Sequence, residues 1–130
     1  MTYMADPKKI LLAEDDEFLR DLYGGELKKA GYEILIASDG EEALQLIRRE
    51  KPDLILLDIM MPKITGLELL KKMKDSEELK TVPVILMTSL KQDSVINEGF
   101  TLGAVGYIVK TEATPSQVVN EVNKFFNSSQ

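Results

Sequence analysis

Short apolar runs alternate with amphipathic segments along almost the whole chain. The apolar runs, typical of buried strands, lie at 8–14, 33–37, 53–58, 84–88 and 103–110. Each is followed by a segment with apolar residues at helical spacing, at 16–30, 39–50, 65–73, 89–100 and 115–126. Five such alternations predict an α/β domain: a doubly wound, five-stranded parallel sheet with helices on both faces, joined by right-handed crossovers.

Polar residues before the apolar stripes mark four of the helix starts. A side chain that caps a helix, with Glu or Gln three residues later, forms a capping box. The four pairs are Asp39 and Glu42, Thr65 and Glu68, Ser89 and Gln92, and Thr114 and Gln117. Pro115 at a first helical position strengthens the last of them. The Gly24-Gly25 pair weakens the first helix, which indicates either a closely packed neighbour or local softness.

Length and composition narrow the classes of function. A chain of 130 residues suits one domain, and 44% hydrophobic with 29% charged residues is typical of globular proteins. The chain has no cysteine or histidine, which excludes disulfides, thiol nucleophiles and imidazole chemistry. A net charge of -6 disfavours direct nucleic-acid binding. Since no apolar run is long enough for membrane insertion and no signal core is visible, a cytoplasmic location is expected.

The remaining chemistry collects where strands are predicted to end. Ligands of open parallel sheets bind beyond the carboxyl ends of the strands. Crowded carboxylates there repel each other and require a cation, and Mg²⁺ accepts carboxylates together with water and phosphate. In this interpretation Asp58 is a nucleophile, Thr88 donates to a phosphoryl oxygen and Lys110 balances negative charge. Taken singly, these residues would more often be capping or solvated groups. The strand-end residues are Glu14, Asp15, Asp16, Asp58, Thr88 and Lys110.

Four motifs in order give the chain a family resemblance. They read ILLAED, DIMMPKITG, VILMTS and GAVGYIVK. With these motifs the chain resembles the receiver domain of bacterial response regulators over about residues 8–126, leaving tails at 1–7 and 127–130. The resemblance implies a flavodoxin-like fold with the strand order 2-1-3-4-5.

The resemblance also implies roles for individual residues. Asp58 would accept a phosphoryl group from a phosphohistidine on a sensor histidine kinase or phosphotransfer protein, with Mg²⁺ or Mn²⁺ required. Asp15 would bind the metal directly and Glu14 through water, while Asp58 and the backbone carbonyl of Met60 complete the protein ligands. Thr88 and Tyr107 would form the switch pair, and Asp16 is interpreted as a helix-start residue.

The sequence departs from the family pattern at two positions. Thr111 stands where many members have proline after the lysine, so the conformation of this loop is left open. Lys63 stands where a small residue is common, and it adds a positive charge with no assigned role. Met60 and Leu90, two apolar positions expected to flank the site, offer little to orient water. We therefore expect slow hydrolysis of an aspartyl phosphate.

No output domain follows the last predicted helix, so the expectation is a stand-alone receiver, monomeric or weakly dimeric on phosphorylation, with an unknown protein target. By resemblance, phosphorylation would be communicated through a face made by 89–100, 105–109 and 115–126. Three alternatives stay open: an Asp-nucleophile phosphatase or phosphotransferase for small molecules, a flavin-binding module, and a pseudo-receiver that only binds partners. The acidic run after the first strand disfavours the flavin module because it would repel a phosphate.

Overall fold

A computed structural model describes residues 6–89 and 91–128 as a parallel sheet covered by helices. The strand order is β2-β1-β3-β4-β5, and every pairing is parallel. This confirms the predicted fold class and strand order. The strands are β1 (Lys9–Ala13), β2 (Glu33–Ala37), β3 (Leu54–Asp58), β4 (Val84–Thr88) and β5 (Gly106–Val109).

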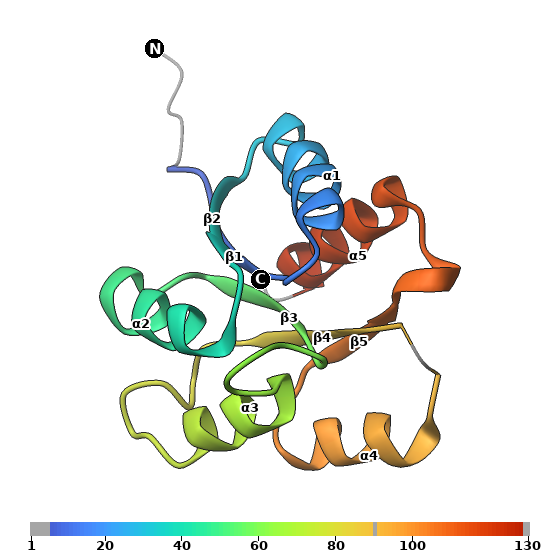
Figure 1. The fold of residues 1–130 in the computed structure, drawn as a ribbon. Helices are drawn as coiled ribbons and strands as arrows, with labels where there is room; N and C mark the ends of the chain where they lie inside the picture. Colours follow the sequence, from blue (N-terminus) through green and yellow to red (C-terminus); the bar gives the residue numbers. More distant parts are fainter. Residues whose placement is uncertain (1–5, 90, 129–130) are drawn as a thin grey trace.

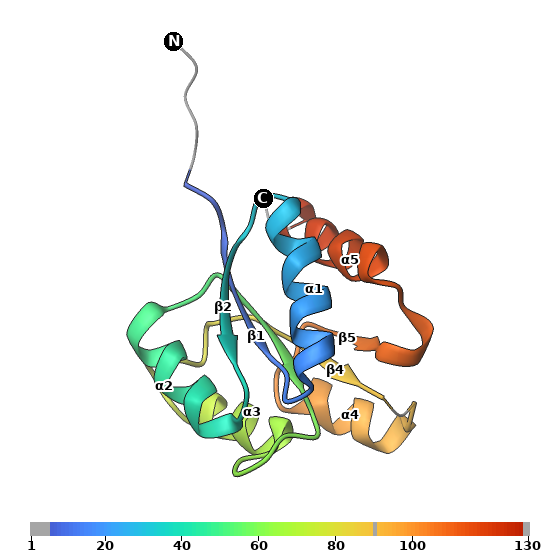
Figure 2. The same ribbon diagram turned by 45° about the horizontal axis from the view of Figure 1, so that its top comes forward.

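Helices cover both faces of the sheet. Figure 1 shows α1 and α5 on one side and α2, α3 and α4 on the other, and Figure 2 shows the same layers after rotation. A short 3-10 helix, η1 (Lys110–Glu112), follows β5. No helix of the described residues is long and apolar enough to cross a bilayer. The helices are α1 (Glu17–Lys29), α2 (Gly40–Glu50), α3 (Gly66–Lys74), α4 (Asp93–Thr101) and α5 (Pro115–Ser128).

The central strands contribute to a hydrophobic core on each side of the sheet. Successive side chains of a strand point to opposite faces. In β1, Leu11 therefore packs in the core under α2 and α3, whereas Leu12 packs in the core under α1 and α5. Leu57 and Leu56 of β3 divide in the same way. Because β3 and all of β1 after Lys9 are buried, polar groups at their carboxyl ends are presented at one edge of a rigid sheet.

Three of the four predicted capping boxes begin a helix as expected. Side chains of Asp39, Thr65 and Thr114 accept hydrogen bonds from the backbone N–H groups three residues later. The prediction at Ser89 is wrong, because α4 begins at Asp93 with Gln92 as its N-cap residue and no capping side chain. Ser89 lies directly after β4, where the chain still has to leave the sheet before a helical turn can form.

The bounds of β5 and α5 differ slightly from the prediction. β5 begins at Gly106 rather than 103, and α5 continues to Ser128. No cis peptide bond occurs among the described residues, and Thr111 lies within η1.

Gly24 faces β2 with room for a methyl group, and a Cβ on Gly25 meets no atom within 4 Å. Close packing therefore does not require glycine at either position.

Candidate functional site

Four strand ends bring the predicted chemical groups together at one edge of the sheet. Glu14 follows β1, Asp58 ends β3, Thr88 ends β4 and Lys110 follows β5. Glu14, Asp58 and Thr88 are 0%, 2% and 4% exposed. Polar groups buried to this degree need partners or a ligand, because desolvation without compensation is costly. The burial separates this cluster from the ordinary surface charges of the protein.

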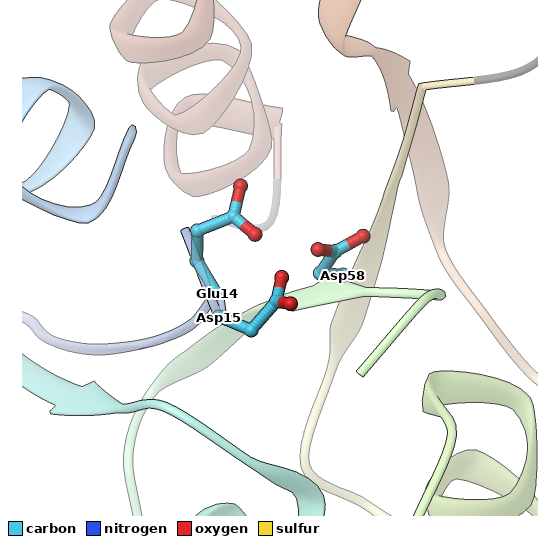
Figure 3. Close-up of side chains that lie close together, drawn as sticks. All are labelled: Glu14, Asp15 and Asp58. Carbon is cyan, nitrogen blue, oxygen red and sulfur yellow. The ribbon is translucent and has the colours of Figure 1, made fainter. Parts of the chain in front are cut away.

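Three carboxylates form a group that fits a hard metal ion. One oxygen from each of Glu14, Asp15 and Asp58 lies within 4.8 Å of the others, and Figure 3 shows the three side chains converging from the ends of β1 and β3. Asp15 is exposed, which leaves the group open to solvent on one side. Oε2 of Glu14 is buried and has no hydrogen-bond partner among the described residues. Oxygen ligands, an open side and an unpartnered buried oxygen suit Mg²⁺ or Mn²⁺.

Lys110 supplies the positive charge inside the cluster. Its Nζ lies 2.8 Å from Oε1 of Glu14 and 3.1 Å from Oδ2 of Asp58. The pKa of Glu14 is raised to about 7, mainly by burial and also by the Asp58 carboxylate, while Lys110 opposes both effects. Burial lowers the pKa of Lys110, but its bonds to the two carboxylates outweigh this, so its pKa is raised. One ammonium group facing two buried carboxylates leaves the site short of positive charge.

The backbone around Asp58 fixes the position of its carboxylate. The N–H group of Met60 donates to Oδ1 of Asp58 at 3.3 Å. Gly66 closes the loop behind it, with its N–H donating to the carbonyl of Ile59 at 2.9 Å. A Cβ on Gly66 would lie 2.4 Å from the carbonyl oxygen of Asp58, so only glycine fits without a backbone shift. The helix start of α3 therefore packs directly against the backbone of Asp58.

Arg20 stabilises the acidic turn and was not predicted as a site residue. Its Nη1 donates to the backbone carbonyls of Glu14 and Asp15, each at 3.1 Å. An arginine one turn into the helix that follows an acidic strand end is a weak sequence signal, since most such residues are solvated.

Asp16 accepts from the N–H group of Leu19 and caps α1, which confirms its interpretation as a helix-start residue.

The other predicted residues differ in burial and in their neighbours. Thr88 is buried beside β5, with Val109 as its register partner. Tyr107 is 40% exposed and packs edge-to-face on Phe100, with the ring centroids 5.9 Å apart. Met60 is exposed, whereas Leu90 lies outside the described residues. In this conformation the ring of Tyr107 belongs to the surface beside α4.

Lys63 has partners away from the carboxylate cluster. Its Nζ lies 3.5 Å from Oδ2 of Asp39 and 3.9 Å from Oε2 of Glu41, both at the start of α2. The backbone of Lys63 has a φ of 70°, in the left-handed region that favours glycine. The sequence did not indicate these ion pairs, because the partners lie more than 20 positions away and belong to another loop.

Comparison with known proteins settles the family. Residues 10–123 match the model of the response regulator receiver domain. The chain belongs to this family. It is 36% identical over 123 residues to the alkaline phosphatase synthesis transcriptional regulatory protein PhoP of Bacillus subtilis, covering 95% of this chain and 50% of PhoP. The receiver thus spans about half the length of that relative.

A shorter relative and a solved structure agree with this assignment. The polar-differentiation response regulator DivK of Brucella anthropi is 39% identical over 112 residues, covering 84% of this chain and 89% of DivK. The structure of the phosphorylated cyanobacterial phytochrome response regulator RcpA is 31% identical, with a TM-score of 0.84, and the match covers 95% of this chain and 96% of RcpA. The receiver assignment therefore rests on both sequence and fold.

Proposed function

We propose that this receiver accepts a phosphoryl group on Asp58 from a phosphohistidine of a sensor kinase or phosphotransfer protein. The observation that carries the proposal is the buried carboxylate of Asp58, held by the N–H group of Met60 on one oxygen and by Lys110 on the other. A carboxylate that is oriented from both sides, in a cluster of acidic groups that one ammonium group only partly neutralises, suits a nucleophile in a site that binds a metal ion. RcpA, which has the same fold, is described as phosphorylated, and this supports the proposal.

Asp58, Lys110 and Thr88 each have a separate role in the proposed phosphoryl transfer. An oxygen of Asp58 forms a bond to phosphorus while the bond from phosphorus to the histidine nitrogen breaks, and the imidazole keeps the electron pair and takes up a proton. Lys110, already bonded to Asp58, neutralises charge on the phosphoryl oxygens. Thr88, buried at the neighbouring strand end, donates its hydroxyl hydrogen to one of these oxygens. Asp58 and Thr88 end their strands, and Lys110 directly follows β5, so all three groups belong to the same edge of the sheet.

Glu14, Asp15, Asp58 and the backbone carbonyl of Met60 would hold the metal ion. When bound, Mg²⁺ or Mn²⁺ supplies positive charge to the phosphoryl oxygens. The unpartnered Oε2 of Glu14 supports this assignment, because a buried carboxylate oxygen without a hydrogen bond is costly. Arg20 keeps the turn that carries Glu14 and Asp15 in place by binding its carbonyls.

The signal would leave through the surface formed by α4, β5 and α5. Phosphorylation adds about 1.5 to 2 negative charges near Thr88 and biases a two-state surface. Tyr107 and Phe100, which pack on each other and are partly exposed, lie on this surface. We propose that the ring of Tyr107 turns inward as Thr88 moves toward the phosphoryl group. A protein target then reads the altered surface, with the receiver acting as a monomer or a weak phosphorylation-dependent dimer.

Acetyl phosphate provides a direct test. Incubation with Mg²⁺ and acetyl phosphate should add one acid-labile phosphoryl group per chain, detected by intact mass, and Asp58→Asn should abolish it. Asp53→Asn is the matched control, since this aspartate lies directly before β3, away from the edge that carries Asp58. An unchanged mass of the wild-type protein contradicts the proposal. Continuous turnover of a phosphorylated metabolite without a lasting adduct would instead favour a small-molecule phosphatase.

A further inference from the structure

The loop between Asp58 and Gly66 is fastened to the start of α2. The carbonyl oxygen of Pro62 accepts from the N–H group of Gly40 at 3.3 Å. Gly40 is the first residue of α2, where backbone N–H groups have no partner within the helix. A Cβ on Gly40 would lie 2.2 Å from the carbonyl oxygen of Ile64, so the two backbones are in direct contact. The loop thus completes the N-terminus of a neighbouring helix.

Lys63 occupies a strained turn at the centre of this contact. The N–H group of Ile64 donates to the carbonyl of Pro62 at 2.8 Å, which closes a three-residue γ-turn around Lys63. With φ at 70°, this is the rare form of the γ-turn, and it is unfavourable for a residue that carries a Cβ. Glycine would fit this backbone better than lysine. A lysine here therefore requires a compensating interaction of its side chain.

The ion pairs of Lys63 provide that interaction. The ammonium group faces Asp39, which caps α2, and Glu41 in the first turn of the same helix. The side chain of Asp39 is 17% exposed, so one of the two pairs is partly shielded from solvent. The γ-turn, the backbone bond of Gly40 and the ion pairs all join the same two segments. Together they restrain the loop whose first residues carry the backbone of Met60.

From this geometry we infer that Lys63 is a positioning residue for the phosphoacceptor loop. It holds the loop against α2 and so keeps the backbone of Met60 oriented toward Asp58 and the metal position. The inference rests on the proposed function, because positioning matters only if Asp58 and the metal are used. It also explains why a residue other than glycine is present in a strained turn.

Removing the charge at this position should loosen the loop and weaken metal binding. For Lys63→Gln, amide hydrogen exchange at Gly40 and Ile64 should quicken about two- to fivefold, as expected for loss of exposed ion pairs. The Mg²⁺ concentration at half-saturation, followed by amide chemical shifts, should rise by a similar factor. Both differences from wild type should shrink in 1 M NaCl, because salt screens such pairs. Lys63→Arg should behave like the wild type.

Two further variants separate positioning from general stability. Lys63→Gly relieves the strained φ, so its urea unfolding midpoint should equal or exceed that of the wild type. The Mg²⁺ concentration at half-saturation should still rise, because the ion pairs are lost. Lys80→Gln removes a lysine that pairs with Glu77 on another loop, and it should change neither the exchange rates nor the half-saturation.

The inference is wrong if Lys63→Gln changes neither the amide exchange rates nor the Mg²⁺ concentration at half-saturation. Equal changes in Lys80→Gln would also overturn it. The exchange rates do not depend on phosphorylation. If the wild type fails to take up a phosphoryl group but Lys63→Gln shows faster exchange and weaker Mg²⁺ binding, the proposed function is wrong and the positioning role stands.

Discussion

Two Gly→Ala substitutions should have opposite effects on stability. At Gly66 a new Cβ would lie 2.4 Å from the carbonyl oxygen of Asp58, and contacts shorter than 3.0 Å are essentially never seen. The backbone of β3 or α3 must therefore shift by at least the difference, 0.6 Å. Because the opposing atom belongs to the backbone, it has no rotamer with which to move away. Overpacking of this kind costs about 1–3 kcal/mol, and we expect Gly66→Ala to lose that amount.

Gly25 lies in α1, and a Cβ there meets nothing within 4 Å. Alanine is favoured over glycine within a helix by about 1 kcal/mol, so Gly25→Ala should gain roughly that amount. Equilibrium unfolding in urea, monitored by far-UV circular dichroism, gives both values from the midpoint at constant slope. The phosphorylation rate with acetyl phosphate should fall in Gly66→Ala alone, since only that change displaces Asp58. A wild-type midpoint for Gly66→Ala, or a lower one for Gly25→Ala, would refute the reasoning.

Three further predictions concern metal binding, pH dependence and a side-chain hydrogen bond. Mg²⁺ at ten times its Kd should stabilise the wild type by about 1.4 kcal/mol in urea unfolding, but not Glu14→Gln, which lacks the anionic Oε2. The pKa of Asp39 is lowered by the N–H group of Glu42 and by Lys63, so its stabilisation is present above its ordinary value of 3.8 and is lost as the pH falls below it. Asp39→Asn, which retains a capping side chain, should therefore be less stable than the wild type at pH 6, and acid titration of the midpoint should show this gap closing toward pH 2. Tyr32→Phe removes a hydrogen bond to Asn123 and should cost about 1 kcal/mol in thermal unfolding.

The local pattern of apolar runs and capping residues was sufficient to predict most of the fold. Thr114 and Asp39 begin their helices as predicted, because a capping side chain acts within its own four residues. The prediction of a helix start at Ser89 was wrong because the same spacing also occurs in a loop, and sequence alone does not show where the chain leaves the sheet. Parallel topology likewise brought Glu14, Asp58 and Lys110 together, as their places at strand ends had indicated.

The parts that sequence did not reveal depend on contacts between loops. Lys63 pairs with residues of another loop, and Gly66 is required by a backbone that lies beside it in space. Periodicity carries no information about such contacts, since they depend on how two completed elements approach each other.

The ammonium group of Lys110 reaches its partners across long stretches of chain, 96 positions from Glu14 and 52 from Asp58. During synthesis, β1 and β3 leave the ribosome well before β5. Until β5 is added at the edge of the sheet, any native-like pairing of β1 with β3 buries two acidic side chains without their counter-charge. Completion of the sheet and neutralisation of its acidic edge therefore occur together.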